Sequence, residues 1–316
     1  MKETSQKFFL TAGKIVVSLF FLYWLIVKIN WSNVVFYAQK ISFWQILIYF
    51  LLFFLSTSIS AYKWSILARV KNFSISFKES LNLYLAGAFI NNFMPSFIGG
   101  DTYKAYILGK LDSEKRYAQA ASTVILDRLT GLLGTMFLAL FFGILNWKII
   151  ASNYFFMLLL LGIAGGLLFL FVLEKSTKYD FGKKLSQKLP KKILEFIKIL
   201  HQYYLDKKLF LRVLSLAVLF AFIGLALLNS IMFWALGIKI SILNYLSVIF
   251  LISIVSSIPL SINNIGVQEW AYITFFGMFG IDPAAVITVS IVIRILQMLA
   301  SFTALPFYLK NKFKKR

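Results

Sequence analysis

Three acidic side chains and two arginines lie inside the long hydrophobic segments of this chain, and the arginines favour the binding of an anion. Of its 12 acidic residues, only Asp101, Asp127 and Glu269 fall clearly within those segments, and of its arginines only Arg128 and Arg294 do. A guanidinium presents a planar fork of donors that suits phosphate. The pattern therefore predicts that Arg128 and Arg294 bind an anionic headgroup. The alternative, that they tie helices together through the three acids, stays open.

Both arginines are expected near the centre of a membrane. Arg128 lies about ten residues into its hydrophobic segment and Arg294 about eleven, which is ~15 Å at the rise of an α-helix. A charge at that depth costs at least ~2.5–3.5 kcal/mol, so each should face the protein interior or a wet cavity and be paired. Asp127 and Arg128 are adjacent, hence about 100° apart on a helix, and are poor partners for each other.

Two short stretches resemble breaks between half-helices. They are "PSFIGGD", residues 95–101, and "PLSINNIGVQE", residues 259–269. Proline removes a backbone donor, glycine permits unusual dihedral angles, and an acid follows at the next helix start. The acids Asp101 and Glu269 either cap these helices or meet a substrate cation or a coupling proton. The predicted break residues are Pro95, Gly99, Gly100, Pro259, Asn263, Asn264 and Gly266.

The composition indicates that membrane-spanning helices must hold these residues. The 316 residues have a mean hydropathy of +0.81 and are 60% hydrophobic and only 14% charged, against roughly 25% charged in soluble domains. We predict an all-α polytopic membrane protein that forms one transmembrane domain over 1–316. Its six full spans, each long enough for a ~30 Å hydrocarbon core, are expected at about 8–29, 43–67, 118–145, 153–173, 210–236 and 283–309. Two broken or re-entrant helical hairpins are expected at about 78–111 and 243–281.

Positive charge in the loops predicts the orientation. The loop 174–208 holds ten lysines and the C-terminal "KNKFKKR" is equally basic, so both are expected in the cytoplasm. Counting back places the N-terminus and the 63–78 loop, with Lys63, inside, and the weakly charged 146–153 and 237–242 loops outside. We thus expect a multi-pass protein of the cytoplasmic membrane with both termini cytoplasmic. Each broken segment then enters and leaves on one side.

The two broken segments also match each other in register. Gly100 and Gly266 are separated by the same 166 residues as Arg128 and Arg294, and so are the Ala-Tyr pairs at 105–106 and 271–272. The predicted topology turns the second unit upside down relative to the first. We therefore predict an inverted repeat, about 43–145 and about 210–309, an architecture found in many transporters.

Other chemistries lack the residues that they need. The chain has no cysteine, which excludes disulfides and thiol catalysis, and it has no zinc, Mg²⁺-diphosphate or ATP-binding motif, so no metal or cofactor is expected. The net charge of +21 lies in loops beside hydrophobic spans. Anionic lipid headgroups, rather than nucleic acid, are the expected partners of such loops.

Four stretches of the chain, taken together, resemble a known family. They are "NNFMPSFIGGDTYKAYIL", "AASTVILDRLTGLL", "SSIPLSINNIGVQEWAYITFFGMFGI" and "VSIVIRIL". They resemble the flippase-like transmembrane domain of lysylphosphatidylglycerol synthases over nearly the whole chain, which implies binding or movement of an anionic lipid headgroup. Lys104 is the nearest equivalent of the family's basic residue after the aspartate. The other motif positions that the resemblance implies are Pro95, Gly99, Gly100, Asp101, Asp127, Arg128, Gly266, Glu269 and Arg294.

The leading hypothesis is a flippase-like transporter that binds or translocates the headgroup of an anionic phospholipid or polyprenyl-phosphate lipid in a polar groove near the midplane. Two alternatives stay open: an intramembrane enzyme acting on a lipid phosphate or polyprenyl carrier, with Asp101 or Glu269 as general base, and a non-transporting partner of a lipid-modifying enzyme. A second copy of the chain is a further candidate partner. No lysyltransferase activity is expected, because the chain ends at Arg316, directly after a span, without the soluble domain of the synthase. The candidate substrate-binding residues are Arg128, Arg294, Asp101, Glu269, Asp127 and Lys104.

Overall fold

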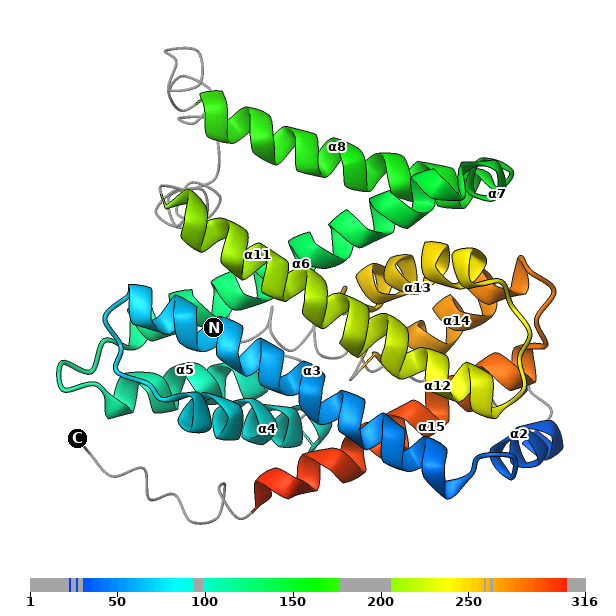
Figure 1. Ribbon diagram of the computed structural model, residues 1–316, viewed down its shortest axis with the longest axis horizontal. Helices are drawn as coiled ribbons and strands as arrows, with labels where there is room; N and C mark the ends of the chain where they lie inside the picture. Colours follow the sequence, from blue (N-terminus) through cyan, green and yellow to red (C-terminus); the bar gives the residue numbers. More distant parts are fainter. Residues whose placement is uncertain are drawn as a thin grey trace, which may run out of the picture.

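A computed structural model describes residues 23, 27, 31–93, 99–176, 206–258, 260–261 and 264–305 of the chain. Throughout these residues the regular elements are helices, and none of them forms a β-strand (Figure 1). The predicted all-α class is therefore confirmed for the described part of the chain.

Four helical stretches are long and apolar enough to cross a membrane, and each coincides with a predicted full span. Two of them are the single helices α3 (Phe43–Val70) and α6 (Tyr117–Leu145). A third joins α11 (Lys207–Ala221), the π-helical segment η1 (Phe222–Leu227) and α12 (Leu228–Ala235). The fourth joins α15 (Pro283–Ser301) and the 3₁₀ turn η3 (Phe302–Ala304).

The remaining two predicted spans are less fully represented. Helix α8 (Tyr154–Ser176) lies at the position of the span 153–173 and packs against α6 and the short helix α7 (Trp147–Ala151). Of the span 8–29, only Tyr23 and Val27 are described, and most of the basic loop 174–208 and all of 306–316 lie outside the described residues. Another short helix, α2 (Trp31–Ala38), was not predicted and packs against α15.

Each predicted broken segment consists of two helices that are too short to cross a membrane alone. The first segment contains α4 (Phe77–Phe93) and α5 (Gly99–Leu111), and the second contains α13 (Ile242–Ser256) and α14 (Val267–Gly277). At a rise of about 1.5 Å per residue, the longest of the four spans about 25 Å and the shortest about 16 Å, against the ~30 Å of a hydrocarbon core.

The two halves of the described chain pack their helices in the same order. In the first half α4 packs against α3 and α5, and α5 packs against α6. In the second half α13 packs against η1 and α14, and α14 packs against α15. The halves meet where α6 packs against α11 and α13 (Figure 1). Each short-helix pair therefore contacts long helices of both halves, since α13 also packs on α6 and α4 also packs on α15.

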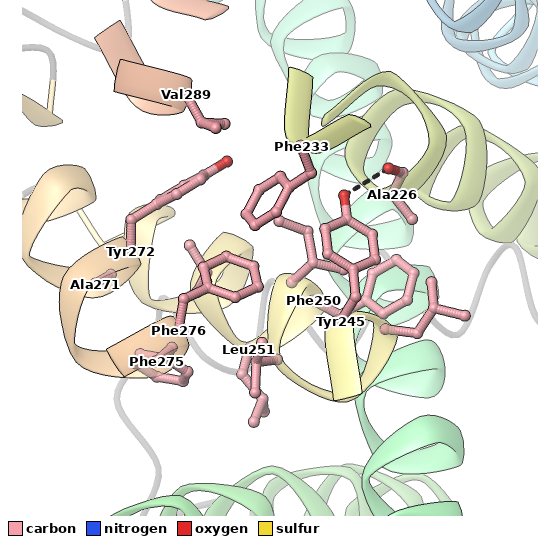
Figure 2. Close-up of a cluster of buried hydrophobic side chains, with 14 of the residues drawn as sticks. Ala226, Phe233, Tyr245, Phe250, Leu251, Ala271, Tyr272, Phe275, Phe276 and Val289 are labelled. Carbon is pink, nitrogen blue, oxygen red and sulfur yellow. Dashed lines mark hydrogen bonds between the residues drawn. The ribbon is translucent and has the colours of Figure 1, made fainter. Parts of the chain in front are cut away.

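The largest apolar core lies in the second half. Aromatic side chains of α12, α13 and α14 pack against one another there, with the ring centres of Phe233 and Phe276 4.6 Å apart in a tilted arrangement and those of Phe233 and Tyr245 5.1 Å apart in an edge-to-face arrangement (Figure 2). The Tyr245 hydroxyl donates a hydrogen bond of 2.7 Å to the carbonyl oxygen of Ala226 in η1. In a π-helical turn the backbone hydrogen bonds join residues five apart instead of four. The Tyr245 hydroxyl is the hydrogen-bond donor for one of the carbonyl oxygens in η1.

Candidate functional site

Two acid–arginine ion pairs occupy corresponding places in the two halves. Asp101 is the third residue of α5, which begins at Gly99, and Glu269 is the third residue of α14, which begins at Val267. Their partners Arg128 and Arg294 are each the twelfth residue of a long helix, α6 from Tyr117 and α15 from Pro283. Each break thus presents an acid in the first turn of its second half-helix to an arginine of the next long helix.

The first ion pair leaves most of its arginine exposed. Arg128 Nε donates to Asp101 Oδ2 at 2.7 Å, and the Arg128 side chain is 54% exposed. The other carboxylate oxygen of Asp101 lies 3.1 Å from Lys104 Nζ, one turn along α5. Among the described residues, the terminal nitrogens Nη1 and Nη2 of Arg128 have no protein partner. They are the groups of this site that are free to bind a ligand.

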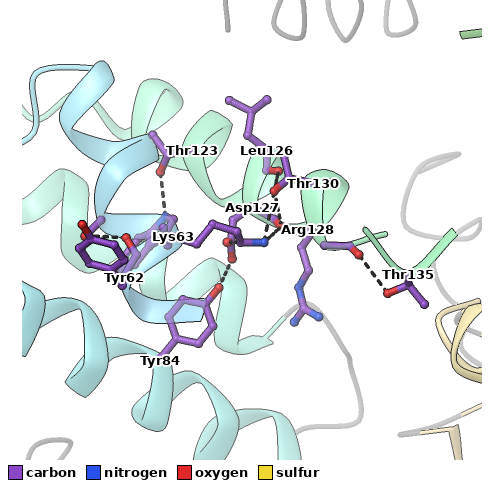
Figure 3. Close-up of polar contacts among 12 residues, drawn as sticks. Tyr62, Lys63, Tyr84, Thr123, Leu126, Asp127, Arg128, Thr130 and Thr135 are labelled. Carbon is purple, nitrogen blue, oxygen red and sulfur yellow. Dashed lines mark hydrogen bonds and ion pairs between the residues drawn. The ribbon is translucent and has the colours of Figure 1, made fainter. Parts of the chain in front are cut away.

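Asp127 belongs to a separate, buried set of contacts. Its carboxylate lies 3.2 Å from Lys63 Nζ and 3.9 Å from Lys104 Nζ and accepts a hydrogen bond from the Tyr84 hydroxyl. Lys63 Nζ also donates to the Asp127 carbonyl oxygen at 2.9 Å and to Thr130 Oγ1 at 3.2 Å. In Figure 3, Asp127 lies between Lys63 and Tyr84, whereas the Arg128 side chain points away from them.

The placement of Lys63 in a cytoplasmic loop is wrong. Helix α3 continues to Val70, and Lys63 is only 2% exposed within it. One feature of the sequence indicates a membrane position for Lys63, because the predicted span 43–67 includes this residue. For a lysine near a predicted span end the loop is the expected place, because loops are where lysine is commonest in membrane proteins. The partner Asp127, 64 positions away in sequence, cannot be identified without the packing of α3 on α6.

Lys104 connects the exposed and buried sets of contacts. Its ammonium lies near both Asp101 and Asp127 and sits 4.0 Å from the centre of the Tyr84 ring. Only 4% of the residue is exposed. Such a cation over an aromatic face is attracted by the ring. Lys104 therefore lies between the two aspartates and is a second cation beside Asp101, in addition to Arg128.

The second ion pair is more enclosed. Arg294 Nη2 lies 3.1 Å from Glu269 Oε1 and 3.3 Å from Gln268 Oε1, and the Arg294 side chain is 21% exposed. Glu269 also accepts hydrogen bonds from Ser290 Oγ at 3.0 Å and, through Oε2, from the Gly266 backbone N–H at 2.7 Å. Glu269 thus caps its own helix, as one of its two expected roles requires, and holds α15 at the same time.

The two matched glycines of the repeat are required for different reasons. A Cβ on Gly100 would stand 2.1 Å from the carbonyl oxygen of Gly87, so this glycine allows α5 to cross α4 closely. Gly266 has a backbone angle φ of +86°, which residues other than glycine rarely adopt. In both halves the glycine N–H is satisfied by a side chain, Asn91 Oδ1 in the first and Glu269 Oε2 in the second.

Only some of the other predicted break residues lie in the described part of the chain. Gly99 begins α5, and Asn264 lies in the turn before α14 with φ +52°. Pro95, Pro259 and Asn263 lie outside the described residues. Within the described part of the chain, no group of three or more histidine, cysteine, aspartate or glutamate side chains is arranged to hold a metal ion.

Comparison with known proteins identifies a family over most of the chain. The family model described as the lysylphosphatidylglycerol synthase TM region matches residues 11–304. This interval includes both ion pairs, both break segments and the buried Lys63–Asp127 contact.

Several archaeal membrane proteins are similar to this chain. A UPF0104 membrane protein of Methanothermobacter thermautotrophicus is 24% identical over 286 residues, which cover 81% of this chain and 82% of that protein. One of Pyrococcus horikoshii is 25% identical over 277 residues, covering 79% and 82%. One of Methanocaldococcus jannaschii is 33% identical over 97 residues, 30% of this chain and 29% of that protein. The similarity thus extends across most of the chain in two of the three relatives.

Proposed function

This chain belongs to the lysylphosphatidylglycerol synthase transmembrane-region family, and from that premise we propose that it is a flippase-like membrane protein that binds and translocates the anionic headgroup of a lipid. The observation that carries the proposal is the unfilled guanidinium fork of Arg128. Its Nε is held by Asp101, while 54% of the side chain is exposed. A phosphate group accepts two parallel hydrogen bonds from such a fork.

The charges around Arg128 favour an anion over a cation. Arg128, Lys104 and Lys63 carry three positive charges, whereas Asp101 and Asp127 carry two negative ones. Lys63 Nζ lies 3.2 Å from the Asp127 carboxylate and donates to two further oxygens. Unbalanced charge at membrane depth is costly. A bound monoanionic headgroup would neutralise the set.

The mechanism that we propose is an exchange of partners at Asp101. The phosphate takes the outer nitrogens of Arg128 and weakens the bond from Nε to Asp101, and Lys104 holds the released carboxylate. Only Arg128, whose side chain is already 54% exposed, then has to move. Because the ion pair is partly exposed, its disruption costs less than that of a buried pair.

The pair Glu269–Arg294 has a corresponding role in the second half. Its equivalent place in the fold and the common helix order of the two halves support the inverted repeat of 43–145 and 210–309. In this proposal the two breaks enter from opposite faces as re-entrant hairpins, the termini are cytoplasmic, and the acyl chains stay in the bilayer while the headgroup crosses. Headgroups of an anionic phospholipid and of a polyprenyl phosphate share the chemistry that Arg128 would recognise.

Native mass spectrometry of the gently extracted protein tests the binding step. Wild type should retain a lipid that carries a phosphate group, and Arg128→Gln should lose it, because glutamine cannot form the charged fork. Lys148→Gln removes a positive charge from an exposed residue of α7 and is the matched control. It should retain the lipid as wild type does.

The proposal fails if Arg128→Gln and Lys148→Gln retain the same lipid in the same amount, or if wild type retains none. A released product that differs covalently from the added lipid would instead favour the intramembrane enzyme. The mass of the retained lipid separates a phospholipid from a polyprenyl phosphate.

A further inference from the structure

The buried contact between Lys63 and Asp127 joins two groups that can share or lose a proton. Lys63 Nζ lies 3.2 Å from Asp127 Oδ1, and the two side chains are only 2% and 3% exposed. Nζ donates hydrogen bonds to two other oxygens, the Asp127 carbonyl oxygen and Thr130 Oγ1. An ammonium has three N–H donors and a neutral amine has two. Loss of one proton from the pair therefore leaves both of these hydrogen bonds in place.

The charges around the pair do not balance while it holds its proton. Lys63, Lys104 and Arg128 then carry three positive charges, and Asp101 and Asp127 carry two negative ones. The start of α5 adds partial positive charge beside Asp101. Without the proton the full charges are equal in number. Because unbalanced charge at membrane depth is costly, the proton is favoured when an anion is bound at Arg128 and disfavoured when none is.

The other helices that pack against α3 do not change this balance. On α4, the Tyr84 hydroxyl donates to the Asp127 carboxylate and is neutral. The segments η1 and α12 contain no titratable side chain. The remaining charged side chains of the helices on α3 lie in a first helical turn or have a partner of their own: Lys78, Glu79, Lys207, Lys208, Arg212 and Arg294.

The pair lies beside the proposed headgroup site. Asp127 precedes Arg128 on α6, and a Cβ added at Gly131 would stand 3.6 Å from Lys63 Nζ. Residues three apart on a helix, such as 128 and 131, are neighbours on its surface. The Lys63 amine is therefore located at the turn of α6 that carries Arg128, and a charge bound to Arg128 acts on it through the protein interior, where screening is weak.

A continuous row of polar groups connects the pair to the exposed part of the site. From Asp127 the row continues to Lys104 Nζ at 3.9 Å and from there to Asp101 at 3.1 Å. The Asp101 side chain is 16% exposed. For proton uptake, Lys104 gives one of its three protons to the Lys63–Asp127 pair and recovers one from Asp101, which takes one from water. Each transfer breaks one N–H or O–H bond and forms another, so Lys104 and Asp101 regain their initial charges.

We propose that the Lys63–Asp127 pair is a proton-binding site coupled to the Arg128 site, so that binding of an anionic headgroup draws one proton onto the pair. The inference rests on the function proposed above and adds its coupling ion. Chains of ionisable side chains carry protons in membrane pumps and transporters. Headgroup and proton cross the membrane together, and the proton gradient drives the lipid.

Calorimetric titration of the purified full-length protein with short-chain phosphatidylglycerol tests the coupling. Titration in two buffers of different ionisation enthalpy counts the protons taken up. The probe is a phosphate diester that keeps one negative charge throughout, so it exchanges no proton itself. Between about pH 7 and about pH 9 wild type should take up about one proton, and its Kd should rise by up to about tenfold per pH unit, because proton uptake and affinity are linked. Lys148→Gln, at an exposed position of α7, should behave as wild type.

Two variants identify the pair as the site of the proton. Lys63→Arg keeps the positive charge but cannot release a proton, because arginine stays protonated in proteins. The double variant Lys63→Met with Asp127→Asn removes both titratable groups. In each variant the heat of binding should be equal in the two buffers, and the Kd should not change with pH.

Wild type decides whether the coupling exists. Binding with equal heats in both buffers at every pH would overturn the coupling and leave the proposed function intact. Proton uptake by Lys63→Arg or by the double variant equal to that of wild type would also overturn it, because another group would then take the proton. Absence of any binding by wild type would overturn the proposed function, and the coupling with it.

Discussion

At the scale of residues, the deep charges of the first half form one buried contact set and one partly exposed ion pair. Lys63 and Asp127 are both almost fully buried and contact each other, with Thr130 and Tyr84 as further hydrogen-bond partners. Arg128, the neighbour of Asp127 on α6, faces a different partner, and within the described residues its two terminal nitrogens have no protein partner. The buried set holds α3, α4 and α6 together, while in our proposal the exposed pair exchanges its partners.

The Lys63–Asp127 contact should be a structural requirement. Replacing Lys63 by Met leaves the Asp127 carboxylate buried without its closest cation, and breaking a buried pair in this way typically costs about 3–5 kcal/mol. The double variant Lys63→Met with Asp127→Asn should regain part of that loss, because the uncompensated charge is gone. Equilibrium unfolding in detergent measures the four members of this cycle. Equal destabilisation by the single and the double variants would show that the charge of Asp127 is not what Lys63 balances.

The sequence could predict which charges lie deep in the membrane but not all of their partners. Hydrophobic context identified Asp101, Asp127, Glu269 and both arginines, because charge is rare in such segments. It did not identify Lys63 as buried or Tyr84 as a partner, because a lysine near a span end and a tyrosine in a helix are common in membrane proteins. Only the tertiary packing distinguishes these two residues from their many equivalents.

At the scale of elements, each break is built by a close approach or a special backbone conformation. Helices α4 and α5 cross at Gly87 and Gly100 with backbone in contact. This crossing sets the position of Asp101, one residue after Gly100, and therefore the position of the Asp101–Arg128 pair. The composition of "PSFIGGD" predicted a break, but the reason for the second glycine required the structure.

Gly100→Ala should damage the first break. Its added methyl group would overlap the Gly87 carbonyl, and overpacking of this kind costs about 1–3 kcal/mol or more. Gly277→Ala, at the end of α14 where a Cβ meets nothing within 4 Å, is the matched control. Melting temperatures of the two purified variants should differ by several degrees. If Gly100→Ala melts together with Gly277→Ala, the close crossing of α4 and α5 is wrong.

The turn between α5 and α6 is held by a surface ion pair that responds to pH. Arg116 donates hydrogen bonds to both carboxylate oxygens of Asp112 and to the carbonyl oxygens of Lys71 and Asn72, so it ties this turn to the one before α4. The hydrogen bonds from Arg116 lower the pKa of Asp112. A lowered folded-state pKa stabilises the protein above the unfolded-state pKa, about 3.9. This contribution is lost as the pH falls through the folded-state value.

The variant Asp112→Asn should therefore be less stable than wild type at neutral pH, by the small amount typical of an exposed pair. The difference should shrink below about pH 4. Melting curves of both proteins across this pH range measure it. A difference that stays constant down to the acid limit would mean that the Asp112 charge does not contribute.

The π-helical segment η1 is an element that sequence patterns did not indicate. Residues 222–227 continue the apolar run of the span 210–236 without a proline or a charge. Two carbonyl oxygens of η1 accept hydrogen bonds from side chains outside it. The Tyr245 hydroxyl donates to Ala226 and the Asn229 amide donates to Leu225. An element whose stability depends on a tyrosine of another helix cannot be predicted from its own residues.

At the scale of the whole molecule, the two halves share a helix order, a break and an acid–arginine pair. The equal 166-residue spacing between glycines and between arginines predicts a repeat, and these shared features support it. The acids do not share that spacing, because Asp101 and Glu269 each occupy the third position of helices whose starts differ by 168 residues, at Gly99 and Val267. The two acids therefore correspond by their position in the helix and not by the 166-residue spacing.

The inverted arrangement can be tested with single cysteines, because the natural chain has none. Ser74→Cys and Ser113→Cys flank the first broken segment, and Lys239→Cys and Gly277→Cys mark the two ends of the second. All four positions are exposed. In intact cells, a membrane-impermeant thiol reagent should label Lys239→Cys and Gly277→Cys and spare Ser74→Cys and Ser113→Cys. Labelling of all four from the same side would rule out the inverted repeat.

Transbilayer movement of a lipid headgroup tests the central claim most directly. Wild type, Arg128→Gln and Lys148→Gln are reconstituted into vesicles that contain a fluorescent anionic phospholipid, and an impermeant quencher reports how fast lipid from the inner leaflet becomes accessible. Wild type and Lys148→Gln should move the lipid, whereas Arg128→Gln should fall to the rate of protein-free vesicles while remaining folded. Movement by Arg128→Gln at the wild-type rate would contradict the account.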